Sequence, residues 1–145
     1  MKAVIQRVHD ASVSVDGEIT GAIANGLLVY LGIEHEDSQQ QLSWLCEKIV
    51  KLRVFSDEQG KMNKNLHDVH GSILVVSQFT LLANLRKGNR PSYNAAAPPE
   101  KAEALYEQSL HVFSEMGYTV ASGRFGTHMK VSYTNDGPVT LLLEA

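Results

Sequence analysis

The sequence contains a single cysteine, Cys46, so no disulfide bond can form within the chain. It also has no apolar run approaching the roughly 20 residues that a membrane-spanning helix needs. Neither sign of charge dominates, because 13 Lys and Arg residues stand against 16 Asp and Glu residues. This balance argues against a general duplex-binding protein, which relies on a strong positive excess. We therefore expect a cytoplasmic protein that makes no membrane contact.

The familiar motifs of nucleophilic and phosphate chemistry are missing as well. The sequence has no G-x-S-x-G elbow and no P-loop, and none of its six histidines falls in a recognisable triad motif. His67 and His70 could bind a metal only with ligands from elsewhere, which favours surface histidines. Cys46 lies on the apolar stripe of a predicted helix, which favours a small buried hydrophobe over a nucleophile. Nothing in the sequence is evidence for a metal.

The 145 residues predict one domain, spanning 1–145. Alternating apolar residues on both sides of Asp16-Gly17 predict a pair of strands, and the apolar runs 26–33 and 72–81 predict buried strands. Helical spacing predicts one helix from Ser38 to about Arg53 and another from Pro98 to just before Gly117. Short strands are predicted at 119–121, 129–133 and 139–144. This order indicates an α/β fold, either a sandwich or a partly rolled mixed sheet, with two covering helices.

The stretch SQFTL, residues 77–81, places polar groups at the carboxyl end of a predicted buried strand. Such strand ends frequently carry active-site groups. The same polar residues can also simply cap the exposed end of the strand, and the pattern alone favours that interpretation. If the chain is an enzyme, the absence of a nucleophile motif favours catalysis by positioned amides and binding geometry.

A basic stretch, RKGNR, directly follows, with Arg86, Lys87 and Arg90 in a predicted loop. One interpretation is a solvated loop. The other is a rim around a pocket that contacts phosphates, which would let the protein hold one end of an RNA. Near the end of the chain, NDGPVT (135–140) looks at first like a hairpin turn. Gly-Pro fits such a turn poorly, because proline lacks the amide that strand pairing uses.

Taken together, SQFTL and NDGPVT resemble the paired signature of the bacterial-type D-aminoacyl-tRNA deacylases, the D-tyrosyl-tRNA deacylase family. Segments such as GLLVYLGI, LRVFSDEQGKMN, KGNRPSY and RFGTHMKVSYTNDGPVT resemble the family in the same order, over essentially the whole chain. The resemblance implies hydrolysis of the ester that joins a D-amino acid to the terminal adenosine of tRNA, and removal of glycine mischarged on tRNA-Ala. It also implies a homodimer of small rolled, barrel-like α/β units, with active sites at the subunit interface and no metal or organic cofactor.

The resemblance assigns a role to Gly137 and Pro138. They match the family's Gly-cis-Pro element, which enters the pocket of the partner subunit. Its backbone carbonyls would hold the α-amino group of the substrate and leave no room for an L side chain. Glycine has no side chain to exclude. Arg7 matches the arginine that steadies this element.

The resemblance places Ser77, Gln78, Phe79 and Thr80 on the opposite wall of the pocket. Thr80 could act as a nucleophile, but the favoured hypothesis is an oxyanion site formed by the Phe79 and Thr80 amides, with the 2′-hydroxyl of the substrate assisting a water. Phe125 and Met129 match the segment that packs on the terminal adenine.

Three residues depart from the family pattern, namely Asn84, Thr127 and His128. The departures at 127 and 128 put contacts near the adenine in question, and the role of Asn84 stays open. Two alternatives accompany the deacylase hypothesis. One is a non-catalytic module that binds the tRNA acceptor end, and the other is an editing module of the threonyl-tRNA synthetase type.

Overall fold

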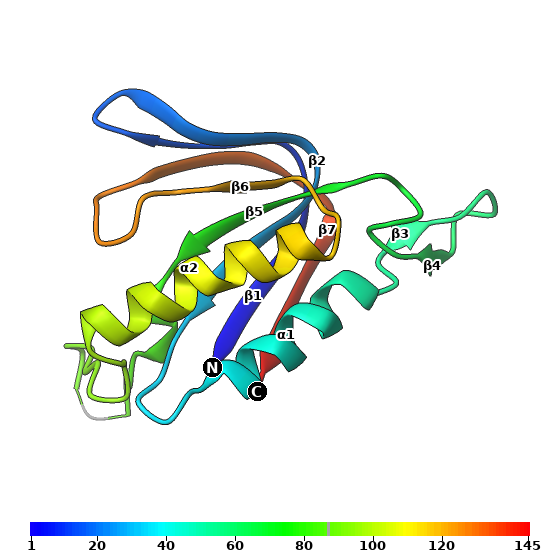
Figure 1. Cartoon of the computed structure of the whole chain (residues 1–145). Coiled ribbons are helices and arrows are strands. Elements are labelled where there is room, and N and C mark those ends of the chain that lie inside the picture. Colours follow the sequence, from blue (N-terminus) through cyan, green and yellow to red (C-terminus); the bar gives the residue numbers. More distant parts are fainter. Residues whose placement is uncertain (87) are drawn as a thin grey trace.

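A computed structural model describes residues 1–86 and 88–145, which form a five-stranded mixed sheet and two helices (Figure 1). The sheet strands are β1 (Lys2–Val15), β2 (Glu18–Gly32), β5 (Ser72–Ser77), β6 (Val120–Ser122) and β7 (Lys130–Glu144), and the helices are α1 (Gln39–Lys51) and α2 (Pro99–Glu115). The order across the sheet is β6-β5-β2-β1-β7. Strand β1 pairs antiparallel with β2 and β7, whereas β5 runs parallel to β2 and β6. The predicted α/β class, mixed sheet and two covering helices are confirmed.

The first two strands form the predicted hairpin around Asp16 and Gly17, whose φ angles are +52° and +87°. Both strands are long and bend midway, so the sheet rolls (Figure 1). At the bend of β2, Gly26 has φ +144°, and a Cβ there would lie 1.9 Å from the carbonyl oxygen of Ser72. Only glycine allows β5 to approach this closely. The run predicted at 26–33 is therefore the second half of β2.

Neighbouring strand residues face two separate cores, because side chains alternate across a sheet. Leu27 packs in the core under the helices, and Leu28 packs in a second core on the opposite face. The helix-side core includes Ala3, Ile5, Val29, Leu42, Leu45, Ile49 and Phe113. The second core consists of Val8, Ala11, Val13, Ile23, Leu28, Leu74 and Val76. Burial on both faces explains why these strands appear as continuous apolar runs.

Both helices begin and end close to the predicted positions. The Ser38 hydroxyl accepts a hydrogen bond from the Gln40 amide at 3.2 Å, and the Gln41 side chain accepts one from the Ser38 amide at 3.1 Å. This capping box fixes the start of α1. Helix α2 starts at Pro99, where a missing amide costs nothing, and Gly117 follows its end with φ +88°.

Two sequence predictions are wrong in detail. The strand predicted over 72–81 ends at Ser77, and the next residues form a 3-10 helix, η1 (Phe79–Leu82). The strands predicted at 129–133 and 139–144 are one strand, β7, so NDGPVT is not a hairpin turn. Beyond the sheet, β3 (Phe55–Ser56) and β4 (Met62–Lys64) form a ribbon that projects from the body (Figure 1). No helix in the described part of the chain could span a membrane.

Candidate active site

The end of β5 and the start of η1 form the first part of the site. The Gln78 amide donates a hydrogen bond to the Leu31 carbonyl at 2.8 Å, which extends the pairing with β2 past the end of β5. The Gln78 side-chain amide then donates to the Thr80 hydroxyl. The amides of Phe79 and Thr80 lie in the first helical turn, where N–H groups have no partner within the helix. Both residues are exposed.

A pocket of about 500 Å³ opens beside this strand end. The loop from β6 to β7 builds the opposite wall, and the start of α2 closes one side. Ala97 and Ala102 leave room there, because their side chains are small. Five of the predicted site residues line the pocket, namely Ser77, Gln78, Phe79, Phe125 and Met129. The predicted wall and the predicted adenine-side segment therefore meet at one pocket, whereas Thr80 is not among the lining residues.

Phe125 is held from behind by a buried tyrosine. The rings of Tyr106 and Phe125 lie 5.8 Å apart between centroids, and the Tyr106 hydroxyl donates a hydrogen bond to the Val75 carbonyl at 3.1 Å. Burial raises the pKa of Tyr106 to about 12, so the hydroxyl stays protonated and keeps this bond. The aromatic wall of the pocket is thereby fixed against β5.

The pocket is mostly apolar and carries little charge. His128 is the only titratable side chain among the described residues that line it. An apolar pocket with a few polar groups suits an uncharged, flat ligand group.

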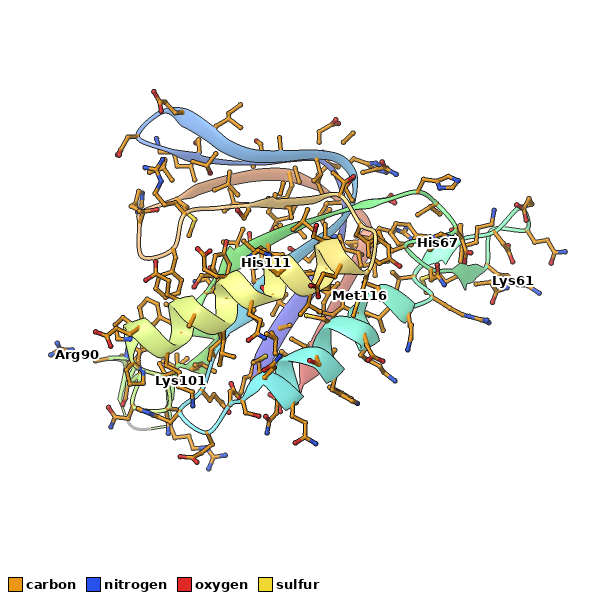
Figure 2. All side chains as sticks on the ribbon, in the orientation of Figure 1. Lys61, His67, Arg90, Lys101, His111 and Met116 are labelled. Carbon is orange, nitrogen blue, oxygen red and sulfur yellow. The ribbon has the colours of Figure 1, made fainter. Side chains whose placement is uncertain are left out.

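The loop between η1 and α2 forms the rim of the pocket. Asn84 and Ser92 exchange two backbone hydrogen bonds, at 2.8 and 3.1 Å, and close this loop at its base. Arg86 and Arg90 are exposed, and Figure 2 shows Arg90 pointing outward from the loop. Lys87, the third residue of the predicted basic rim, lies outside the described residues. The described arginines are available to a ligand that leaves the pocket at this rim.

A wide bulge interrupts β7 on the other side of the sheet. Val8 pairs with Asn135 and Gln6 pairs with Thr140, so the single residue Arg7 of β1 faces four residues of β7, 136–139. The extra residues leave the plane of pairing. Gly137 and Pro138 are exposed, and the peptide bond between them is cis, as predicted.

The side chain of Asn135 closes the base of this bulge. Its amide nitrogen donates hydrogen bonds to the carbonyl oxygens of Arg7 at 3.1 Å and Val139 at 3.0 Å. Its amide oxygen lies 3.4 Å from the Gln6 amide nitrogen and 3.3 Å from the Thr140 hydroxyl, and it accepts from both. One side chain therefore ties both ends of the bulge to β1.

Arg7 lies under the bulge, with 9% of its surface exposed. Its Nε is 2.8 Å from Oδ2 of Asp136, and its Nη1 donates to the Val54 carbonyl. Nε has no acceptor in line with its N–H among the described residues, so the contact with Asp136 is an ion pair and not a hydrogen bond. Gly137 has φ +110°, and a Cβ there would lie 2.6 Å from Nη2 of Arg7. The positive φ favours glycine at this position, and an added Cβ would also force the end of the Arg7 side chain to shift.

The bulge does not reach the pocket of its own chain. Neither Gly137 nor Pro138 lines that pocket, and β1 and β2 separate β7 from β5 in the sheet. The family resemblance predicts that Arg7 steadies the Gly-Pro element, but it assigns no role to Asn135 or Asp136. The only available signal was that Asn and Asp side chains often bond to nearby backbone.

Apart from His128, the titratable side chains in the described part of the chain do not line the pocket. Cys46 is fully buried in α1, and burial raises the pKa of its thiol to about 12, which confirms a buried hydrophobe over a nucleophile. His67 and His70 are neighbours, with ring centroids 6.4 Å apart. No group of three or more His, Cys, Asp or Glu side chains suited to a metal occurs among residues 1–86 and 88–145.

Comparison with known proteins identifies close relatives over the full chain. The family model described as D-Tyr-tRNA(Tyr) deacylase matches residues 4–144. A protein of Opitutus terrae named D-aminoacyl-tRNA deacylase is 56% identical over 100% of this chain and 97% of its own length. A protein of the same name from Thermosipho africanus is 52% identical over 100% of this chain and 97% of its own length.

Solved structures match the fold as well. The structure titled c-Myc DNA Unwinding Element Binding Protein superimposes with a TM-score of 0.94 at 46% identity, covering 100% of this chain and 99% of that one. A second, titled as a probable eukaryotic D-amino acid tRNA deacylase, gives a TM-score of 0.85 at 17% identity over 98% and 97% of the two chains, and at that identity it supports the fold alone.

Proposed function

We propose that this chain, which belongs to the D-Tyr-tRNA(Tyr) deacylase family, removes D-amino acids from tRNA. The members named above hydrolyse the ester bond of aminoacyl-tRNA. In this proposal, the Gly137–Pro138 bulge rejects L-amino acids. The observation that carries the proposal is the separation of two features on the chain. The pocket is at the end of β5, beside the start of η1, and the exposed bulge is on β7. A dimer in which each chain supplies one feature to the other completes the site.

The pocket receives the terminal adenosine. Phe125 and Met129 line the wall against which the adenine packs, and the volume of about 500 Å³ is within the range of small-ligand sites. Such a position for the adenine brings the 3′-ester to the end of β5, beside Ser77 and Gln78. The rim arginines, Arg86 and Arg90, contact phosphates of the tRNA 3′ end.

Catalysis relies on backbone amides. The Phe79 and Thr80 amides stabilise the negative charge that develops on the carbonyl oxygen as water attacks the ester. The 2′-hydroxyl of the substrate assists the water, and the ribose 3′-oxygen leaves. Thr80 accepts a hydrogen bond from Gln78, and its side chain is not a pocket-lining group, which supports a mechanism without a threonine nucleophile. The mechanism uses no metal or organic cofactor.

The bulge selects D-amino acids in the partner's pocket by excluding L side chains. The carbonyls of Gly137 and Pro138 accept hydrogen bonds from the α-amino group of a D-amino acid, and the backbone occupies the space that an L side chain needs. Glycine has no side chain to clash, so glycine mischarged on tRNA-Ala is also a substrate. Asn135 and Arg7 support this role, because they tie the bulge firmly to β1.

An apolar surface beside the bulge supports the homodimer. Val4 of β1 pairs with Tyr30 of β2 and with Leu142 of β7, which places the three side chains on one face. Leu142 is 64% exposed on this face. Contiguous exposed apolar residues are typical of protein interfaces. A second copy of the chain covers this face and brings its bulge to the pocket.

A paired ester-hydrolysis assay tests the proposal. The protein is incubated with D-tyrosyl-tRNA and, separately, with L-tyrosyl-tRNA, in a buffer with the pH and ionic strength of the cytoplasm. Loss of each ester is compared with its spontaneous hydrolysis. We expect rapid loss of the D ester and none of the L ester above background. Binding without hydrolysis would indicate an acceptor-end-binding module, and equal rates or cleavage limited to an L ester would indicate an editing module.

A further inference from the structure

An ordered aromatic pair stands at the rim of the pocket. The rings of Phe79 and Tyr93 lie 4.9 Å apart between centroids, with an interplanar angle of 66°. Phe79 is 56% exposed, although it also lines the pocket. The backbone amide of Phe79 has a proposed role in catalysis, but that role does not require an aromatic side chain.

Two rigid segments hold the pair. Phe79 belongs to η1, which follows directly from the central strand β5. The Tyr93 carbonyl accepts a hydrogen bond from the Ala96 amide at 2.9 Å, and the next residue, Ala97, donates to the Ile33 carbonyl at 2.9 Å. The segment after Tyr93 is therefore tied to the end of β2 beside the pocket. The exposed ring of Phe79 is preorganised for a ligand.

The charge of the loop that carries Tyr93 indicates what kind of ligand fits. Arg86 and Arg90 are exposed in the loop that carries Tyr93. Aromatic rings beside arginines are the combination that binds single-stranded nucleic acid, because bases stack on the rings while arginines contact the phosphates. An apolar peptide would not require the arginines, and a free phosphate would not require the rings.

We propose that Phe79 and Tyr93 form a stacking site for the base of the nucleotide that precedes the terminal adenosine of tRNA. The inference rests on the proposed function, which places the terminal adenosine in the pocket. The preceding nucleotide must then leave the pocket at a rim, and this aromatic pair lies on the rim that carries the arginines. The cytosine of the tRNA end stacks on the exposed face of Phe79, and Tyr93 supports that ring from the side.

A comparison of two minimal substrates tests the site. They are the D-tyrosyl ester of adenosine and the D-tyrosyl ester of the dinucleotide CpA. The wild-type protein should show kcat/KM about tenfold higher for the dinucleotide ester, mainly through KM, because each stacked base contributes binding of that size. Tyr93→Ala should reduce this ratio toward one, and Tyr93→Phe should retain it. Trp44→Ala, which removes a 48% exposed aromatic side chain from α1, serves as the matched control and should leave the ratio unchanged.

The outcomes separate the inference from the function on which it rests. A wild-type ratio of one, with normal cleavage of the adenosine ester, would overturn the stacking site and leave the deacylase proposal intact. An unchanged kcat/KM ratio in Tyr93→Ala would overturn the stacking site too. So would a change in the oligomeric state of the Tyr93→Ala variant, because that change would place the aromatic pair at the subunit interface. If neither ester is cleaved, the function fails first. Calorimetry then tests the stacking site without turnover, by comparing the affinity of the protein for unesterified CpA with its affinity for adenosine.

Discussion

The guanidinium of Arg7 and the carboxylate of Asp136 form an ion pair, with Nε 2.8 Å from Oδ2. The side chain of Arg7 is 11% exposed and that of Asp136 is 38% exposed, so the pair is shielded on the arginine side. A buried cation that loses its partner is costly, because its charge is left uncompensated. Since Asp136 directly precedes Gly137, this pair couples the position of the bulge to β1.

Removing this ion pair should relax chirality selection. We expect Asp136→Asn and Arg7→Lys to lower the D/L ratio, defined as kcat/KM for D-tyrosyl-tRNA divided by that for L-tyrosyl-tRNA, by about 100-fold, because a displacement of about 1 Å in a positioning element has effects of that size. Lysine lacks the fork that contacts Asp136 and Val54 together. The control is Glu144→Gln, which removes the exposed Lys2–Glu144 pair between the same two strands. An unchanged D/L ratio in Asp136→Asn and Arg7→Lys, as in the control, would contradict the role of the pair.

Asn135 should be a positioning residue for the bulge. Asn135→Asp keeps the size of the side chain but removes the amide that donates to the carbonyls of Arg7 and Val139. We expect the free energy of unfolding to fall by about 1–3 kcal/mol, the usual cost of leaving such groups unpaired, and the D/L ratio to fall as well. Thr140→Val removes the hydroxyl that donates to Asn135 at 3.3 Å and accepts from Gln6 at 3.0 Å, but it leaves the Asn135 amide in place and should have a smaller effect on both. Chemical denaturation and paired kinetics measure the two quantities, and an effect on stability alone would refute positioning.

Gly137→Ala should disturb the bulge through a specific clash. The new Cβ would meet Nη2 of Arg7 at 2.6 Å, in a backbone conformation that L residues rarely adopt. The matched control is Gly60→Ala, whose φ is +77° but whose added Cβ meets no atom within 4 Å. Both variants should lose about 1–2 kcal/mol of unfolding free energy from the backbone conformation. Only Gly137→Ala should lower the D/L ratio, and equal ratios in the two variants would show that crowding of Arg7 is irrelevant.

The amide mechanism predicts a mild effect of Thr80→Ala. Loss of the hydroxyl should lower kcat on D-tyrosyl-tRNA by less than about 100-fold, whereas removal of a nucleophile costs about 10⁶-fold. His128→Gln tests the remaining titratable group of the pocket, and it should change KM more than kcat. Single-turnover rates between pH 5 and 9 measure both variants. A loss near 10⁶-fold in Thr80→Ala, or a pH inflection near neutrality that disappears in His128→Gln, would restore side-chain catalysis.

Elements that follow local rules could be predicted from the sequence. The capping box at Ser38 and the apolar stripe of α1 define a helix without any long-range information. The Asp16-Gly17 turn likewise defines the first hairpin. The start of η1 could not be found, because Phe79 and Leu81 alternate with polar residues beyond Ser77, a pattern that also fits a continuing strand. The strand ends where its pairing with β2 stops, after the Ser77–Leu31 pair and the hydrogen bond from the Gln78 amide to the Leu31 carbonyl.

The site itself depends on long-range contacts that local sequence does not encode. NDGPVT is a bulge because both of its flanks pair with the same strand, β1, which lies more than 100 residues earlier. The wall formed by Phe125 and Met129 was placed by family resemblance, and no periodicity marks a loop as a pocket wall. Asn135 was within a quoted motif, yet its contacts become evident only when Arg7 and Gln6 lie beside it.

The central claim is that the bulge of one chain reads chirality in the pocket of its partner, and mixed dimers test it most directly. One subunit carries Ala102→Trp, which fills the pocket, and the other carries Gly137→Ala. With two affinity tags, the heterodimer is purified away from both homodimers. Its one open pocket belongs to the Gly137→Ala chain, and the bulge facing that pocket is intact.

The measurement is the D/L ratio of this heterodimer. We predict D-tyrosyl-tRNA cleavage at about half the wild-type rate, since one of two equivalent sites works, with rejection of L-tyrosyl-tRNA at the wild-type level. The Ala102→Trp homodimer should be inactive, and the Gly137→Ala homodimer should cleave the L ester. A heterodimer that cleaves the L ester as readily as the Gly137→Ala homodimer would show that the bulge acts on its own chain, and would contradict the account.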